Sequence, residues 1–423
     1  MQHWLTEVSK TGRITAYTSR FYTTDLPRLF GLFNDPNSWP MEAPERLMRI
    51  VPEQLLAFSF DNDTRVEITF ERVRAGLFRV WLMHEQLRDE AELAACQGYW
   101  DEILQDIFDR LLCQPVHAAT AFGKINLFFA VGPLQEDGYH QVASLYQSVN
   151  LAETVVAELA ADWEVAVTGT LDQAHLDAVP TNRNNLVVKA AKAAGAALKL
   201  RKVPRLALTI HKCVPVAGGM GGGSADAAAA LLAAESAWGQ TLAASERHAA
   251  ASELGADVPF ALAGGAAIGE GTGHELTAID QRLKLHWVLI PNDFGLSTPA
   301  VYAELDRLRD MRGDNPKWVA PATLNPALVR ALESTEATAE DIAPLLHNDL
   351  QEAALSLRPE LGQILDLAER AQALRAIVSG SGPTIALLAR DANDAIAIAS
   401  RMTTFGQQAI VTSSPAGPAQ LVY

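Results

Sequence analysis

Basic charge and cysteine are both scarce in this sequence. Its 423 residues include 34 Lys and Arg against 50 Asp and Glu, which gives a formal net charge of −16 at pH 7. Because nucleic-acid binding depends on Lys and Arg that neutralise phosphates, this balance argues against a nucleic-acid partner. The three cysteines, Cys96, Cys113 and Cys213, lie far apart and form no CxxC pair. We therefore expect neither a disulfide framework nor a zinc knuckle.

Long apolar runs are also absent. No stretch approaches the ~20 continuous apolar residues that a membrane span requires. The N-terminal sequence "MQHWLTEVSKTGR" has no apolar core of the signal-peptide type. These absences predict a cytoplasmic protein without a membrane partner. The chain is longer than the roughly 100–200 residues of one domain, so we expect more than one.

The first part of the chain predicts a small α+β domain over residues 1–115. "RVEITFERV" and "GLFRVWLMH" alternate apolar and polar residues, which predicts an antiparallel hairpin. Residues 91–112 then place Ile103, Leu104, Ile107 and Leu111 at helical spacing. Pro115 interrupts this pattern, and an alanine-rich segment of different character follows.

The remaining sequence predicts two further domains, over residues 116–291 and 292–423. Alanine-rich stretches at 187–198 and 227–234 predict buried helices. Near the end, "LRAIVSGSGPTIALLARD" predicts a strand, a glycine turn and a second strand, and "DAIAIASRMTTFG" predicts a helix after them.

The segment "GGMGGGS" enters an alanine-rich helix and contains no lysine. It therefore lacks the lysine of a P-loop, and it does not fit the Rossmann pattern, in which an acidic residue follows about twenty residues on. Helix N-termini leave backbone N–H groups unpaired and carry partial positive charge, which suits polyphosphate. The alternative is a flexible connector that uses glycine's freedom in φ. We favour a nucleotide-phosphate loop formed by Gly218, Gly219, Met220, Gly221, Gly222, Gly223 and Ser224.

Three motifs together resemble those of the GHMP kinases. "PVAGGMGGGSADAA" is similar to their glycine loop, "TAFGKINLFF" to their N-terminal motif and "VSGSGPTIALL" to their C-terminal motif. The added "DGYH" and "LGADVPFALAGG" resemble the branch that acts on a cytidylyl substrate. The resemblance covers about residues 117 to 423. Phe122 and Gly123 stand where the family usually has proline and alanine, and their effect on the site is left open.

The resemblance implies an α+β, two-domain GHMP kinase fold, with a ribosomal-protein-S5-like part and a ferredoxin-like part. It also implies transfer of phosphate from ATP, with Mg²⁺, to the 2-hydroxyl of a cytidylyl-linked methylerythritol in the non-mevalonate route to isoprenoid precursors. Mg²⁺ takes few protein ligands, so no metal ligand is assigned. Two alternatives remain: a GHMP kinase for homoserine, mevalonate or a sugar, and a non-catalytic nucleotide sensor.

Phosphoryl transfer needs positioning, charge neutralisation and a place for the acceptor's proton. The resemblance assigns Asp257 as the base or electrostatic anchor and Lys124 as the residue that orients it. The structural alternatives are that Asp257 caps a helix ahead of Pro259 and that Lys124 is a solvated lysine at a strand end.

For the cytidylyl substrate, the resemblance implies that Tyr139 stacks on cytosine, that His140 bonds its edge, and that Tyr302 closes the opposite face. The family more often has Phe at the last position, so the Tyr302 hydroxyl needs a partner. An exposed turn histidine is the alternative for His140. Asn126 lies two residues from Lys124, on the same face of a strand, and would hold the methylerythritol hydroxyls.

Three further residues match nucleotide-binding positions of the family. Ser224 would meet a β-phosphate or Mg²⁺, while Lys212 and Asn185 would line the nucleotide pocket. The domain over residues 1–115 loosely resembles helix-grip (SRPBCC) domains related to activators of heat-shock-protein ATPase, truncated at its N-terminal side. We expect it to serve an interaction or to be a fused passenger, and assign it no catalytic residue.

Overall fold

The chain forms two compact units in the computed structural model, which describes residues 4–74, 76–111, 117–136, 138–271, 275–313 and 321–422. The first unit joins the N-terminal segment up to Val116 with Ala392–Val411, and the second comprises His117–Asp391 and Thr412–Val422. The boundary expected near residue 115 lies outside the described residues. The division into three domains stays a prediction.

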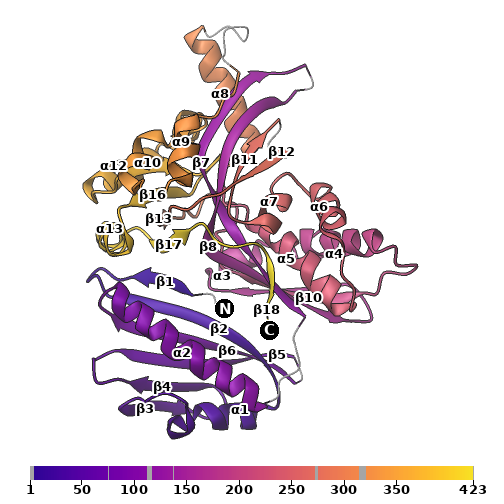
Figure 1. Ribbon diagram of the computed structural model, residues 1–423, viewed down its shortest axis with the longest axis vertical. Coiled ribbons are helices and arrows are strands. Elements are labelled where there is room, and N and C mark those ends of the chain that lie inside the picture. Colours follow the sequence, from indigo (N-terminus) through magenta and orange to yellow (C-terminus); the bar gives the residue numbers. More distant parts are fainter. Residues whose placement is uncertain are drawn as a thin grey trace. The chain divides into compact units, whose positions relative to one another are not determined.

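The first unit is an antiparallel sheet with helices packed on it (Figure 1). Its strand order is β17-β1-β2-β6-β5-β4-β3. The predicted hairpin is confirmed, because β5 and β6 pair antiparallel. The unit's elements are β1 (Leu5–Val8), β2 (Ile14–Thr23), α1 (Leu26–Phe33), β3 (Arg46–Val51), β4 (Leu55–Ser59), β5 (Arg65–Arg74), β6 (Leu77–Leu87), α2 (Glu90–Leu111), α13 (Ala392–Thr404) and the start of β17 (Ile410–Ser414).

Helix α2 confirms the predicted amphipathic helix and lies across the sheet (Figure 1). It buries the four residues predicted from the sequence, Ile103, Leu104, Ile107 and Leu111, and also Trp100. The indole N–H of Trp100 donates to His84 Nδ1 on β6 at 2.9 Å. The only polar atom of the Trp100 side chain is therefore hydrogen-bonded inside the core.

The C-terminal segment of the first unit is bonded to its N-terminal strand. Thr6 and Glu7 of β1 pair antiparallel with Val411 and Ile410 of β17. In addition, the Thr403 hydroxyl at the end of α13 donates to the backbone oxygen of Val8 at 3.1 Å. Residues from the two ends of the sequence therefore complete one structural unit.

The second unit contains a mixed sheet built around a long hairpin of β7 and β8 (Figure 1). The strand order is β12-β11-β8-β10-β9, and β7 pairs with β8, β14 and β18. The predicted strand beginning at "KINLFF" is part of β7. The sheet's strands are β7 (Ala118–Leu134), β8 (His140–Leu159), β9 (Glu164–Gly169), β10 (Leu206–Lys212), β11 (Ala266–Glu270), β12 (Glu275–Ile279), β14 (His347–Asn348) and β18 (Gln420–Val422).

Both alanine-rich stretches are buried helices, as predicted. Small side chains let α4 and α5 approach each other and the sheet closely, and alanine favours the helix. The helices packed around this sheet are α3 (Gln173–Asp177), α4 (Leu186–Ala197), α5 (Gly222–Ala237), α6 (Ala244–Ser252) and α7 (Val258–Ala263).

The rest of the second unit holds a small antiparallel sheet of order β15-β16-β13. The predicted strand, glycine turn and strand near the C-terminus are β15 and β16. The elements are β13 (Leu285–Ile290), α8 (Thr298–Arg312), α9 (Pro326–Glu333), α10 (Ala339–Ile342), α11 (Gln351–Leu357), α12 (Glu360–Arg370), β15 (Arg375–Val378) and β16 (Ile385–Ala389).

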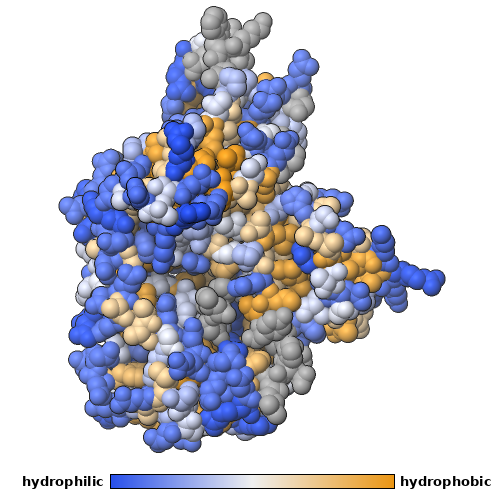
Figure 2. Space-filling model, viewed as in Figure 1, coloured by the Kyte–Doolittle hydropathy of each residue, from blue (hydrophilic) through white to orange (hydrophobic). Residues whose placement is uncertain are grey.

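Hydrophilic side chains cover most of the face shown in Figure 2, as expected for a strongly acidic chain. Within the described ranges, no helix combines the length and apolarity needed to cross a bilayer.

Candidate active site

Three sequence motifs meet at Lys124. The Lys124 backbone N–H, on β7, donates to Met220 O at 2.9 Å, which joins the strand to the glycine loop. Its ammonium Nζ donates to Gly219 O and to Asn126 Oδ1, both at 2.9 Å. A Cβ placed on Gly380, in the turn between β15 and β16, would lie 3.6 Å from the same Nζ. The N-terminal, glycine-loop and C-terminal motifs therefore share one location.

Gly123 allows strand β7 to approach the glycine loop. The pairing of β7 with β8 shifts register between Phe122 and Lys124, as in a β-bulge. A Cβ on Gly123 would lie 3.1 Å from Val214 Cγ2 and 3.4 Å from Met220 O. Gly123, which stands where the family usually has alanine, thus lies at a position where only a very small residue fits.

The glycine loop also packs against the β15–β16 turn. Gly219 has φ of +74°, and a Cβ there would lie 2.5 Å from Ser379 O. Gly221 has φ of +69° and forms the N-cap of α5. Side chains rarely adopt these positive φ values, and at Gly219 no side chain fits. The loop needs glycine at both positions.

The N-terminus of α5 is suited to an anion. The first bond within the helix runs from Ala225 N–H to Gly221 O, so the N–H groups of Gly222, Gly223 and Ser224 precede the intrahelical ladder. Gly223 is exposed, and a Cβ there would meet nothing within 4 Å. Open backbone at a positive helix end fits the phosphates of a nucleotide.

Lys124 and Asp257 flank the same glycine. A Cβ on Gly221 would lie 3.3 Å from Lys124 Cγ and 4.0 Å from Asp257 Oδ2. Burial lowers the pKa of Lys124, although the charge of Asp257 raises it. Lys124 is 8% exposed, so the alternative of a solvated lysine is wrong. Asp257 occupies the N-cap position of α7, but its side chain makes no capping bond, which leaves the carboxylate for another role.

Aromatic side chains surround these two charged groups. The Lys124 ammonium lies 5.8 Å from the ring centroid of Tyr146, and Tyr146 packs on Phe260 with centroids 5.3 Å apart. Burial, reinforced by the charge of Asp257, raises the pKa of Tyr302 to about 12. The same causes, burial first, raise the pKa of Tyr146. Both phenols therefore stay neutral, and Asp257 supplies the negative charge near them.

His140 and Tyr302 lie together, whereas Tyr139 lies in solvent. The rings of His140 and Tyr302 stack with centroids 5.3 Å apart and an interplanar angle of 26°. His140 is 8% exposed, so it is not an exposed turn histidine. Tyr139 is 65% exposed. Tyr139 is therefore not part of the stacked pair, and its contact with a base stays a prediction.

Asn126 shares a strand face with Lys124, as expected, but protein atoms engage its amide. Asn126 Oδ1 accepts from Lys124, and Asn126 Nδ2 donates to the Ser144 hydroxyl at 2.7 Å. The side chain is 1% exposed. In this conformation Asn126 positions Lys124, and contact with substrate hydroxyls stays a prediction.

The structure does not bring Lys212 or Asn185 to an open surface. Lys212 donates to Glu153 Oε1 at 2.5 Å and to Asp226 Oδ2 at 2.8 Å, and it is 3% exposed. Asn185 caps α4: its Oδ1 accepts from Val187 N–H at 2.9 Å, and its Nδ2 donates to Pro180 O. Both residues have structural partners, so their predicted nucleotide contacts find no support in this geometry.

Sequence reasoning missed several residues around the site. Tyr146 is the cross-strand partner of Asn126. The sequence indicates a turn at "DGYH", but not the register shifts between β7 and β8 that determine which residue of β8 lies opposite Asn126. Neither Glu153 nor Asp226 was assigned a role from the sequence, although both are buried beside Lys212. No cluster of three or more His, Cys, Asp or Glu side chains suited to a metal occurs in the described part of the chain.

Family models place the chain among the GHMP kinases. Residues 185–265 match the GHMP kinases N terminal domain, and residues 324–408 match the GHMP kinases C terminal domain. The structure of a 4-(cytidine 5'-diphospho)-2C-methyl-D-erythritol kinase superposes with a TM-score of 0.57 at 27% identity, over 71% of this chain and 100% of that one. The L. major mevalonate kinase superposes with a TM-score of 0.56 at 16% identity over 71% of this chain and 96% of its own, which supports the fold alone. The predicted GHMP kinase fold is confirmed.

Sequence relatives give a more specific assignment. A 4-diphosphocytidyl-2-C-methyl-D-erythritol kinase of Paenarthrobacter aurescens is 43% identical over 315 residues, which cover 72% of this chain and 97% of the relative. The enzyme of the same name from Leifsonia xyli is 46% identical over 276 residues, covering 65% of this chain and 88% of the relative. Similarity of this extent, over 97% of the first relative, shows the family. The chain belongs to the 4-diphosphocytidyl-2-C-methyl-D-erythritol kinase family of the GHMP kinases.

Proposed function

We propose that this chain transfers the γ-phosphoryl group of ATP to the 2-hydroxyl of 4-diphosphocytidyl-2-C-methyl-D-erythritol. The observation that carries the proposal is the meeting of the three motifs at Lys124, beside a carboxylate that caps nothing. Phosphoryl transfer requires little covalent chemistry from a protein, and depends on positioning and on charge stabilisation.

The proposed roles follow from the geometry. The open N–H groups at the start of α5 hold the ATP phosphates, and the Lys124 ammonium stabilises charge on the transferring group. The substrate hydroxyl oxygen forms a bond to the γ-phosphorus as the bond to the bridging oxygen of ADP breaks. Asp257 accepts the hydroxyl proton or anchors the acceptor electrostatically.

When bound, Mg²⁺ would neutralise charge on the phosphates of ATP. We assign the hydroxyl of Ser224, in the first turn of α5, to contact with Mg²⁺ or with the β-phosphate.

On the other side of the site, Tyr139 and Tyr302 are proposed to enclose the cytosine, and His140 to bond its edge. Aromatic stacking on a base contributes about 1–3 kcal/mol. This part of the proposal explains why an aromatic pair lies beside the kinase centre, because neither homoserine nor mevalonate offers a ring to stack.

The test is phosphorylation by the full chain with ATP and Mg²⁺, measured as product formation by mass spectrometry. 4-Diphosphocytidyl-2-C-methyl-D-erythritol, homoserine and R-mevalonate are compared as acceptors. We expect turnover of the first alone. Turnover of another acceptor instead would overturn the substrate assignment, and ATP binding without any turnover would favour a nucleotide sensor.

Asp257→Asn tests the chemistry in the same assay. We expect kcat to fall by about 10²–10⁴ while ATP still binds, because the contribution of general acid–base catalysis is of this size. The matched control is Asp280→Asn, a surface carboxylate paired with Arg282 in the same unit. Equal activity of the two variants would remove Asp257 from the mechanism.

A further inference from the structure

Helix α8 carries three side chains that reach the β7–β8 hairpin. Tyr302, Asp306 and Arg309 are four and three residues apart, which places them on one face of the helix. Tyr302 stacks on His140, and Asp306 Oδ2 lies 3.2 Å from His140 Nε2. Arg309 continues this row toward the end of β7.

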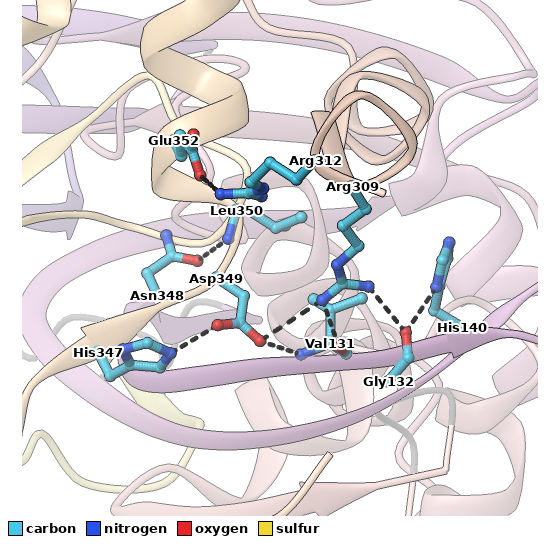
Figure 3. A network of polar contacts seen from close by, with 10 residues as sticks. All are labelled: Val131, Gly132, His140, Arg309, Arg312, His347, Asn348, Asp349, Leu350 and Glu352. Carbon is cyan, nitrogen blue, oxygen red and sulfur yellow. Dashed lines mark hydrogen bonds and ion pairs between the residues drawn. The ribbon is translucent and has the colours of Figure 1, made fainter. Parts of the chain in front are cut away.

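Arg309 binds two consecutive backbone carbonyls of β7. Its Nη2 donates to Val131 O at 2.7 Å, and its Nη1 donates to Gly132 O at 3.1 Å. The Val131 N–H donates in turn to Asp349 Oδ2 at 2.8 Å, and this carboxylate oxygen lies 3.9 Å from Arg309 Nη2. Figure 3 shows the guanidinium between Asp349 and the Gly132 carbonyl. Val131 is thus held at both its backbone N–H and its C=O, and Gly132 at its C=O.

The Gly132 carbonyl also binds His140. It accepts from His140 Nδ1 at 2.9 Å, so one oxygen receives both the arginine and the imidazole (Figure 3). A carbonyl oxygen only accepts, which requires a proton on Nδ1 in this contact. The nitrogen that carries the proton decides whether a histidine donates or accepts at a given position. Gly132 O at Nδ1 and Asp306 Oδ2 at Nε2 therefore set the direction of the ring, and Gly132 O fixes the proton on Nδ1.

We infer that Arg309 is a positioning residue that determines selectivity for cytosine. It fixes the Gly132 carbonyl, and through it the orientation of His140 and the proton on its Nδ1. Cytosine and uracil differ mainly in donors and acceptors on one edge, so a histidine discriminates between them only when its proton position is fixed. This inference rests on the proposed function, in which His140 bonds the base.

The experiment compares Arg309→Met with Arg312→Met. Arg312 lies three residues further along α8 and pairs with Glu352 at 2.8 Å, so its replacement removes an ion-paired arginine from the same helix. For R309M we expect the KM for the cytidylyl substrate to rise about tenfold or more, the size expected for a lost charge-assisted hydrogen bond. The KM for ATP should stay within about twofold, and the preference for the cytidylyl over the uridylyl analogue should shrink.

R312M should match the wild type in all three measurements. Equal KM values and equal base preference in R309M and R312M would overturn the inference. So would a parallel rise in both KM values of R309M, which indicates general disruption. If R309M does not fold, Arg309→Lys is judged by the same measurements, because a single ammonium cannot reproduce the fork that binds two carbonyls.

A second readout is independent of turnover. The ¹H–¹⁵N correlation of the His140 imidazole reports which nitrogen carries the proton. We expect it to change in R309M and not in R312M, and an unchanged signal in R309M would overturn the inference. If the wild type phosphorylates no cytidylyl substrate, the proposed function fails, and this signal still decides whether Arg309 positions His140.

Discussion

At the scale of single residues, Lys212 is bound by two carboxylates in the core of the second unit. Glu153 and Asp226 both accept from its ammonium, and one charge cannot neutralise two. Burial raises the pKa of Glu153 to about 8, and burial also raises the pKa of Asp226. The combined attraction of the two carboxylates outweighs burial and raises the pKa of Lys212.

We therefore expect Lys212→Met to destabilise the protein by about 3–5 kcal/mol, because it leaves the buried Asp226 carboxylate without a counter-charge. Urea unfolding at pH 7 measures this. Lys189→Met, which removes an exposed lysine from α4, is the control and should change stability little. If Lys212→Met left stability unchanged but greatly lowered the affinity for ATP, this would instead support the predicted direct contact of Lys212 with the nucleotide.

Residue types in the motifs could be read from the sequence, but their contacts could not. Lys124 and Asp257 were identified by the resemblance, and the structure places them beside one glycine. Lys212 and Asn185 also match the family, yet long-range pairing with Glu153 and a local helix cap engage them. Nothing in the spacing of a lysine reveals a carboxylate fifty-nine residues away in the chain.

At the scale of elements, the glycine loop contains positions with opposite requirements. At Gly219 a Cβ would collide with Ser379 O, and φ is positive, whereas at Gly223 it would enter open space. We expect Gly219→Ala to lower Tm by several degrees, since an alanine at such a φ costs about 1 kcal/mol or more even without a collision.

Gly223→Ala should leave the Tm of the nucleotide-free protein near that of the wild type. Calorimetric titration with ATP separates an effect on nucleotide binding from an effect on stability. If phosphate lies on the open N–H groups, the methyl group at position 223 should weaken ATP binding without loss of stability. Equal Tm values for both variants would contradict the packing of Gly219 against the β15–β16 turn.

For the hairpin of β7 and β8, the sequence predicted a strand but not the register in which the two strands pair. Apolar alternation indicated a strand at "KINLFF", but pairing shifts register at three places along the hairpin. Each shift changes which side chain faces the site. Tyr146 and Ser144 were missed for this reason, because bulges depend on contacts such as that of Lys124 with Met220 and have no simple sequence pattern.

At the scale of the whole molecule, the match to the GHMP kinases C terminal domain, residues 324–408, includes part of the segment that belongs to the first unit. That segment pairs with β1 through β17, and its Thr403 hydroxyl, on α13, donates to the backbone oxygen of Val8. A separable fused passenger over residues 1–115 would contain no residues from the C-terminal part of the chain, whereas the first unit also includes residues 392–411.

We expect a chain that begins at residue 117 to be less stable than the full chain, because residues 392–411 lose the strand that pairs with Ile410 and Val411. Thermal unfolding and size-exclusion chromatography measure the loss as a lower Tm and as aggregation of an uncovered strand edge. The same Tm and the same phosphorylation rate in both chains would identify a separable passenger.

The buried group of Glu153, Lys212 and Asp226 also affects the proton balance of folding. The formal charge of −16 counts every carboxylate as ionised, but with a pKa of about 8 Glu153 holds a proton at pH 7 in the folded chain. An unfolded glutamate, with a pKa near 4.3, releases it. Between these values folding takes up a proton, so stability falls as pH rises through this window. The heat of unfolding measured at pH 7 should accordingly depend on the ionisation enthalpy of the buffer that receives this proton.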